Sequence, residues 1–387
     1  MTQAAERERF QTNRVIIISA GHALHDTYTT FLPPLLPAFI EKLSLSKTEA
    51  GLLSVFLQAP SLLQPAIGHL ADRVNLKYFV IFAPAVSATM MSMLGIAPGY
   101  AMLALLLLIA GFSSAGFHSV APVMAGTLSG RSLGRGMGFW MLGGELGRTL
   151  GPIVVVSVVG LVSLRGLPWL IIFGVMASAA LYSMLKEAPV RPPDTGPGLP
   201  WKQALHKMKP VMAPLTGIIA VRAFMLSALI IYLPTFLTEE GASFWLAGAS
   251  LSLYEAAGVA GALCGGWMSD RLGRRFVLVI SMIASPLSMF VFLAVGGWIR
   301  FALLLVLGFT ALSIAPVIMA LVQESFPENR AFANGIYMSL SFGLRSGAVV
   351  FVGALGDSFG LSFAFLICAV IMVLGVPFVV LLPGARR

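Results

Sequence analysis

Six ionisable residues lie inside long apolar stretches of the sequence, where a charge needs a specific reason to be present. A charged side chain in the middle of a membrane span costs about 2.5–3.5 kcal/mol even on mild insertion scales, so such residues face partners or a pathway rather than lipid. Carboxylates in this setting can take up and release protons, and guanidinium groups can bind anions. The six residues are Asp26, Glu145, Arg148, Arg222, Glu255 and Arg345.

Arg148 and Arg345 occupy corresponding positions in the two halves of the chain. A guanidinium group forks onto carboxylate or phosphonate oxygens, so we expect the two to clamp an anionic substrate. The simpler alternative is that each arginine pairs with a carboxylate, Arg148 with Glu145 three residues earlier and Arg345 with Glu255. The expected substrate-binding set also includes Arg222, Glu145, Tyr254 and Tyr337.

Asp26 and Glu255 are the expected proton carriers. A carboxylate that gains and loses an arginine partner between two states binds and releases protons, which couples a substrate to the proton gradient. Asp26 lies beside His25, which we include in the proton pathway, and Glu255 lies beside Tyr254. The alternative for Asp26 is a hydrogen bond between helices.

His22, His25 and Asp26 follow the spacing i, i+3, i+4 and therefore share one face of a helix. These donors suit a transition metal. A single helix supplies too few ligands, however, so polar packing is the favoured interpretation, and no metal or other cofactor is expected. His118 is expected to act as a gating or packing residue rather than as a proton carrier.

Composition identifies the class of protein that holds these side chains. Of the 387 residues, 58% are hydrophobic and 11% are charged, with a mean hydropathy of +0.90, whereas soluble domains are about 25% charged. These values exclude an ordinary soluble enzyme, a disulfide scaffold and a disordered chain. Long continuous apolar runs, rather than alternating strands of about ten residues, predict an all-α membrane protein.

Twelve apolar segments are long enough to cross a membrane, which takes about 20 residues. We expect them to form two pseudo-symmetric six-helix bundles, residues 1–186 and 212–387. A cytoplasmic linker at 187–211, rich in Pro and Gly, joins the bundles. A short helix at the membrane surface is expected over residues 201–209. The expected spans are 14–40, 49–70, 78–98, 100–127, 136–160, 168–186, 212–237, 245–268, 276–297, 300–322, 332–355 and 360–383.

The distribution of lysine and arginine orients these spans. With both termini in the cytoplasm, 18 of the 25 Lys and Arg residues fall on the cytoplasmic side and 4 on the outer side, as the positive-inside rule requires. The net charge of +9 therefore reflects topology and anionic lipid rather than nucleic-acid binding. We expect a multi-pass protein of the inner (plasma) membrane.

Short motifs repeat between the two halves. Asp72-Arg73 follows the second expected span, and Asp270-Arg271 follows the eighth, where the run continues to Arg275. A charged loop of this kind can form ion pairs with helix ends in one access state and release them in the other, so these five residues are expected to gate. Repeated six-helix units are typical of transporters with a substrate site near the midplane.

On these motifs the chain resembles the major facilitator superfamily, whose signature G-x-L-x-D-R-x-G-R-R corresponds to residues 266–275. It is similar in particular to the fosmidomycin-resistance branch, in residues 22–26, 61–68, 111–118 and 323–327. The resemblance implies the major facilitator fold, proton-coupled export of a phosphonate antibiotic and other compounds by a rocker-switch mechanism, and a monomeric protein.

Gly143, Gly147 and Gly151 are spaced four apart and are followed by Pro152. Small residues at this spacing let two helices approach closely, so we expect helix packing here. The stretch also resembles the antiporter motif in the fifth span of the superfamily, which favours exchange or export over uptake.

The sequence contains neither a GxxxxGK[ST] loop nor an HExxH motif, and we expect no enzyme. The leading interpretation is a proton-coupled exporter of a small organic anion such as a phosphonate, phosphorylated metabolite or carboxylate, with substrate, protons and membrane lipid as partners. The alternative is a multidrug/proton antiporter for amphipathic or cationic compounds, with Asp26, Glu145 and Glu255 as counter-charges. A third is a membrane scaffold or sensor.

Overall fold

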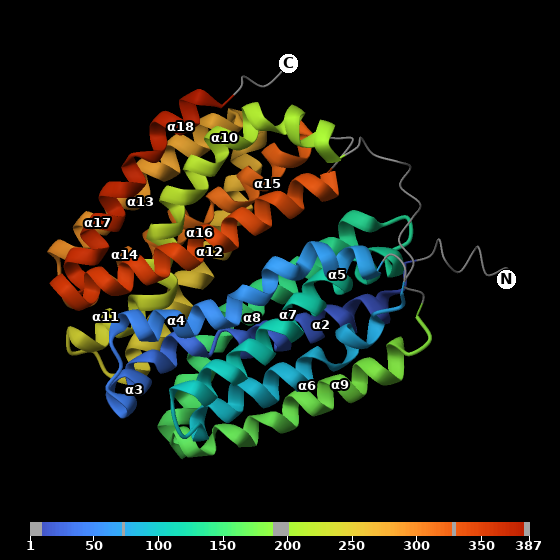
Figure 1. The fold of residues 1–387 in the computed structure, drawn as a ribbon, viewed down its shortest axis with the longest axis horizontal. Helices are drawn as coiled ribbons and strands as arrows, with labels where there is room; N and C mark the ends of the chain where they lie inside the picture. Colours follow the sequence, from blue (N-terminus) through green and yellow to red (C-terminus); the bar gives the residue numbers. More distant parts are fainter. Residues whose placement is uncertain (1–9, 72–73, 189–200, 327–329, 383–387) are drawn as a thin grey trace. The chain divides into compact units, whose positions relative to one another are not determined.

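The computed structural model describes residues 10–71, 74–188, 201–326 and 330–382, and every regular element in these ranges is a helix (Figure 1). The prediction of an all-α membrane protein is confirmed. Residues 189–200 of the predicted linker lie outside the described residues, as do the predicted gating residues Asp72 and Arg73.

The chain forms two compact units. The first comprises Met1–Leu35 and Leu53–Asp194, and the second comprises Leu36–Leu52 and Thr195–Arg387. The helices up to residue 185 are α2 (Thr12–Thr29), α3 (Leu32–Leu43), α4 (Lys47–Gln58), α5 (Gln64–Ala71), α6 (Lys77–Met93), α7 (Tyr100–Leu128), α8 (Leu133–Val162) and α9 (Ile171–Leu185). The later helices are α10 (Trp201–Leu226), α11 (Leu233–Glu239), α12 (Phe244–Leu272), α13 (Arg274–Ala294), α14 (Trp298–Leu312), α15 (Ile314–Ser325), α16 (Arg330–Phe359), α17 (Leu361–Val373) and α18 (Gly375–Leu381).

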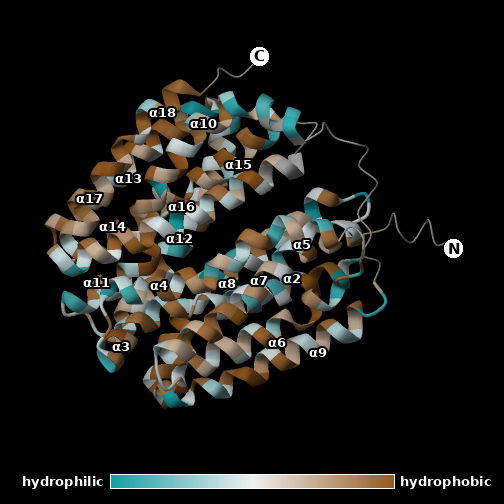
Figure 2. Ribbon diagram, viewed as in Figure 1, coloured by the Kyte–Doolittle hydropathy of each residue, from teal (hydrophilic) through white to brown (hydrophobic). Residues whose placement is uncertain are grey.

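Eleven helical segments in the described part of the chain are long and apolar enough to cross a membrane. They overlap the predicted spans one for one from 49–70 onward. Large apolar side chains lie on their outer surfaces, as lipid contact requires; Leu161 is 84% exposed and Trp169 is 80% exposed. Figure 2 shows the corresponding hydrophobic colouring along the helices, with hydrophilic segments towards many helix ends.

The first predicted span, 14–40, is not one helix. Helix α2 ends at Thr29 and α3 begins at Leu32, directly before Pro33 and Pro34. Proline lacks the N–H that would continue the α2 hydrogen-bond ladder and disfavours helical geometry in the residue before it, so the helix breaks at Thr30 and restarts where prolines are tolerated.

The predicted surface helix over 201–209 is also wrong as a separate element. Helix α10 runs without interruption from Trp201 to Leu226, through Pro210 and Pro214, and a π-helix follows at Ser227–Tyr232. Lysine, glutamine, alanine, leucine and methionine, which dominate residues 202–209, are strong helix formers, so the membrane helix extends past its apolar part.

Within the second unit, Asp357 of α16 fixes the start of α4. Its carboxylate accepts hydrogen bonds from the main-chain N–H groups of Lys47 (2.6 Å) and Thr48 (3.0 Å) and from the Thr48 hydroxyl (2.6 Å). Tyr232 donates its hydroxyl proton to the carbonyl oxygens of Lys47 (3.1 Å) and Val349 (2.9 Å). These bonds join Leu36–Leu52 to the later helices of the same unit.

Candidate functional site

Helices α2 and α8 pack closely in the first unit because three glycines of α8 face the α2 main chain. A Cβ atom added at any of them would collide with an α2 carbonyl oxygen. The opposed pairs are Gly143 with Ser19, Gly147 with Ala23, and Gly151 with Thr27. Both series advance four residues at a time, so the glycines form a continuous packing seam, next to the buried Pro152.

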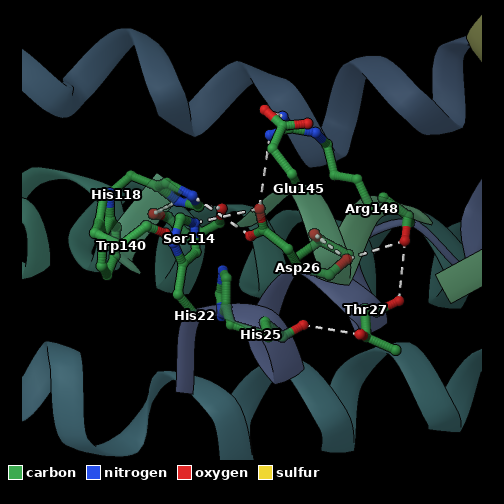
Figure 3. Close-up of polar contacts among 12 residues, drawn as sticks. His22, His25, Asp26, Thr27, Ser114, His118, Trp140, Glu145 and Arg148 are labelled. Atoms are coloured by element: carbon green, nitrogen blue, oxygen red, sulfur yellow. Dashed lines mark hydrogen bonds and ion pairs between the residues drawn. The ribbon is translucent and has the colours of Figure 1, made fainter. Parts of the chain in front are cut away.

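The seam brings the side chains of α8 next to Asp26 of α2, which is 4% exposed. The Asp26 carboxylate lies 3.3 Å from Nε2 of His22, one turn earlier on the same helix. It lies 3.4 Å from Nε2 of His118 on α7 and 3.9 Å from the Arg148 guanidinium on α8. Figure 3 shows the carboxylate between His118 and Arg148, so three helices meet at one buried negative charge.

The opposite ring nitrogens of both histidines bind main-chain carbonyl groups. His22 Nδ1 lies 2.9 Å from the Trp140 carbonyl oxygen, and the His22 ring stacks on the Trp140 ring with centroids 3.7 Å apart. His118 Nδ1 lies 3.0 Å from the Ser114 carbonyl oxygen. A carbonyl oxygen accepts hydrogen bonds only, so in these contacts Nδ1–H is the donor; the Ser114 hydroxyl also lies 3.2 Å from His118 Nδ1. Both imidazoles are thereby oriented with Nε2 towards Asp26.

Arg148 forms an ion pair with Glu145, three residues earlier on α8. The Arg148 side chain is 42% exposed, whereas those of Glu145 and Asp26 are 25% and 6% exposed. The simple alternative from the sequence, a Glu145–Arg148 pair, is therefore present. The guanidinium nevertheless remains the most accessible charged group of this cluster.

His25 shares the rings of Phe117 and His118 as neighbours with His22, but its hydrogen-bond partner is different. It is fully buried, its Nδ1 lies 2.9 Å from the Ser87 hydroxyl, and its ring stacks on Phe117 with centroids 4.5 Å apart. His25 therefore packs α2 against α6 and α7 while its neighbour Asp26 faces the charged cluster.

A second group of buried polar residues lies in the second unit. Arg222 of α10 is 8% exposed, and Glu255 and Tyr254 of α12 are 6% and 0% exposed. The Tyr254 hydroxyl is close enough to Arg222 and Glu255 to interact electrostatically with both, and it has no hydrogen-bond partner among the described residues. A buried polar group without a partner is costly, so this group is a candidate site rather than simple packing.

Arg345 and Tyr337 lie on α16. Tyr337 is 5% exposed and Arg345 is half-buried, with its guanidinium carbon 5.9 Å from the centre of the Phe342 ring. A clamp formed by Arg148 and Arg345 remains a prediction.

The ion pairs at the end of α12 are made by Arg274, which is not among the predicted gating residues. Arg274 contacts the carboxylates of Asp270 and Glu324, each at 2.6 Å. Arg271 stacks over the Trp267 ring at 4.0 Å, and Arg275 is exposed at the start of α13. Gly273, with φ of 93°, breaks the helix between α12 and α13 and turns the chain there, so the position of Arg274 depends on a bend that charge pattern alone does not reveal.

The sequence is similar to a known protein family and to individual proteins. The sequence model of the Major Facilitator Superfamily matches residues 18–267 and 220–387. The fosmidomycin resistance protein of Escherichia coli (strain K12) is 23% identical over 377 residues, which cover 96% of this chain and 92% of that protein. The uncharacterized MFS-type transporter YfnC of Bacillus subtilis (strain 168) is 24% identical, covering 96% of this chain and 93% of that one.

The fold is also similar to solved structures. A bacterial homolog of the human lysosomal transporter Spinster, in an inward-facing and occupied conformation, superposes with a TM-score of 0.83. The two chains are 16% identical, and the match covers 96% of each. At this identity the likeness concerns the arrangement of helices along the whole chain.

Proposed function

The chain belongs to the Major Facilitator Superfamily of membrane transporters, and on that premise we propose that it exports a small organic anion by alternating access, driven by protons. The substrate class that the site favours is a phosphonate, phosphorylated metabolite or carboxylate. The proposal is supported by an accessible arginine in the first unit, a buried carboxylate in the second unit, and the name of a relative.

The exposure of the Arg148 side chain is the observation that supports an anionic substrate. A guanidinium costs several kcal/mol within a membrane span unless it serves a partner or a pathway. Glu145 and Asp26 compensate the charge of Arg148, yet its side chain stays 42% exposed. A substrate carboxylate or phosphonate can replace Glu145 on the same planar fork, because the geometry of the two acceptors is alike.

Glu255 is the proton carrier that we propose. It is buried beside Tyr254, whose hydroxyl lacks a hydrogen-bond partner in the described part of the chain, and it acts on that hydroxyl together with Arg222. A carboxylate in such a setting is stable either as an ion near arginine or as a neutral acid that donates to a neighbour. Asp26 is the weaker candidate, because the Arg148 guanidinium, 3.9 Å away, already compensates the charge of its carboxylate.

The name of a relative supports export as the direction of transport. One relative, matched over 92% of its length, is called a fosmidomycin resistance protein. A membrane transporter confers resistance most simply by removing the compound from the cell. We extend export to this chain on that basis.

A ligand panel tests the substrate class. Detergent-purified protein is heated with fosmidomycin, phosphorylated metabolites, dicarboxylates and lipophilic cations in turn. We expect an anion to raise the unfolding temperature, since a ligand at 100 times its Kd stabilises the folded state by about 2.7 kcal/mol. The same anion should not stabilise Arg148→Ala.

Arg135→Ala is the matched control, because Arg135 lies on the same helix with its guanidinium over Phe10 and Phe139. Stabilisation by cations alone, unchanged in Arg148→Ala, would overturn the proposal.

One observation favours the alternative, a multidrug exporter for cationic compounds. The cluster in the first unit holds two carboxylates, Asp26 and Glu145, for one guanidinium, Arg148. A lipophilic cation would be attracted to this excess of negative charge. In that case Arg148→Ala should strengthen binding of the cation rather than abolish binding of an anion.

A further inference from the structure

His22, Asp26 and His118 bring three ligand atoms together from two helices. One atom from each side chain, a histidine nitrogen or a carboxylate oxygen, lies within 4.8 Å of the other two. His22 and Asp26 are 5% and 4% exposed, while the His118 side chain is 31% exposed. The sequence places two of these residues one turn apart on α2, and the fold adds the third from α7.

The hydrogen bonds of the two histidines determine which nitrogen faces Asp26. Each Nδ1–H donates to a main-chain carbonyl oxygen, that of Trp140 for His22 and that of Ser114 for His118. In the neutral ring, Nε2 then carries a lone pair and no proton. Histidines that bind metal ions commonly donate the other ring N–H to a carbonyl group in this way, which fixes the tautomer and the ring orientation.

The facing atoms are all acceptors when the imidazoles are neutral. Nε2 of His22 and Oδ1 of Asp26 are buried and have no hydrogen-bond partner of normal geometry among the described residues. Two nitrogen lone pairs and a carboxylate repel one another unless a proton or a metal cation lies between them. Buried acceptors without a donor are costly, so with both imidazoles neutral the arrangement favours a metal cation at their centre.

The spacing suits a small transition-metal ion. Zinc lies about 2.0–2.1 Å from nitrogen and 2.0–2.2 Å from oxygen in tetrahedral sites, which places neighbouring ligand atoms about 3.3–3.5 Å apart. His22 Nε2 is 3.3 Å from Asp26 Oδ2, and His118 Nε2 is 3.4 Å from Asp26 Oδ1. A modest rotation of the carboxylate, with the imidazoles drawn closer together, would bring one oxygen and both nitrogens around a single ion.

We infer that His22, Asp26 and His118 form a three-ligand site for a divalent transition-metal ion of the zinc type. Imidazole nitrogen selects zinc, copper, nickel or cobalt over the hard ions magnesium and calcium. Three protein ligands leave a fourth coordination position open. The surrounding charges favour a cation, because the two negative charges of Glu145 and Asp26 exceed the one positive charge of Arg148. The remaining titratable neighbour is His25, which stacks on Phe117 with its ring centroid 5.5 Å from that of His118.

This inference does not depend on the proposed substrate or on proton coupling. Its test uses the metal alone, without substrate or a pH gradient. A failure of metal binding would leave the role of Arg148 in anion binding untouched, and a failure of anion binding would leave the metal site untouched.

Cobalt spectroscopy on the unmodified protein tests the site directly. The full-length chain, purified with a tag that contains no histidine and treated with a chelator, is titrated with Co²⁺. We expect one equivalent to bind with the intense visible absorption of a four-coordinate ion, and Zn²⁺ to displace it. Absence of binding, or the weak spectrum of a six-coordinate ion, would overturn the inference without any variant having to fold.

Variants then identify the ligands through Zn²⁺ affinity measured by calorimetry. His22→Gln, Asp26→Asn and His118→Gln should each weaken binding at least tenfold, the lower end of the effect of losing even an outer-shell partner. The matched control is the double variant His69→Gln/His206→Gln, which removes two exposed histidines elsewhere. Affinity that survives His22→Gln and His118→Gln but disappears in the control would show surface binding and contradict the site.

Discussion

The carboxylate of Asp26 on α2 lies 3.4 Å from Nε2 of His118 on α7. This contact joins two helices at a buried charge, and the glycine seam of α8 places Arg148 beside the same carboxylate. The close approach of α2 and α8 therefore allows the charged side chains of Asp26 and Arg148 to meet in the first unit.

Gly147→Ala should destabilise the protein. A methyl group at this position would collide with the Ala23 carbonyl oxygen, so the two helices must separate, at a cost of about 1–3 kcal/mol. The measurement is thermal unfolding in detergent. Gly138→Ala on the same helix is the control, because its Cβ would meet nothing within 4 Å. Equal unfolding temperatures for the two variants would show that the seam does not hold α2 and α8 together.

Asp357→Ala should destabilise the second unit. The carboxylate accepts hydrogen bonds from the first main-chain N–H groups of α4, and loss of such a cap costs about 0.5–2 kcal/mol. Asp357→Asn keeps one acceptor oxygen and should lose less. Chemical or thermal unfolding of the two variants side by side measures the difference. An unfolding temperature for Asp357→Ala equal to that of the unmodified chain would argue against the cap.

Arg274→Ala should slow transport more than Arg275→Ala. Arg274 joins Asp270 to Glu324, whereas Arg275 is exposed next to it. Exposed ion pairs contribute roughly 0–1 kcal/mol to stability, so both variants should unfold at nearly the same temperature. Initial transport rates in vesicles provide the readout. If the two variants transport equally, the ion pairs around Arg274 have no part in the conformational cycle.

Glu255→Gln should separate substrate movement from the proton gradient. The amide resembles the neutral acid and cannot release a proton, so uphill transport should stop while exchange of labelled for unlabelled substrate continues. Both rates are measured in proteoliposomes with and without an imposed pH gradient. Accumulation driven by the gradient in Glu255→Gln would remove Glu255 from the proton pathway.

Hydropathy was sufficient to predict most of the fold, because membrane helices require long apolar runs that are visible in the sequence. Eleven spans overlap the predicted ones. The two errors arose at Pro33-Pro34 and in α10, where local backbone chemistry rather than hydrophobicity sets the helix end.

The candidate site was only partly predictable. The i, i+4 spacing placed His22 and Asp26 on one face of a helix, and the i, i+3 spacing anticipated the Glu145–Arg148 pair. The contact from His118 depends on how α7 is rotated against α2, and the orientation of His22 depends on the Trp140 carbonyl group. Neither follows from a pattern within one helix, so the sequence could not assemble the trio that we propose as a metal site.

Charge reversal at Arg148 tests the central claim, that this residue binds an anionic substrate. Purified Arg148→Glu and Arg148→Lys are reconstituted into proteoliposomes, and uptake of the anion identified by the thermal panel is measured beside that of a lipophilic cation. We predict that Arg148→Glu loses anion transport at least about 100-fold while Arg148→Lys, which keeps the charge but not the fork, retains part of it. Undiminished anion transport by Arg148→Glu, or transport of the cation alone by the unmodified protein, would contradict the account.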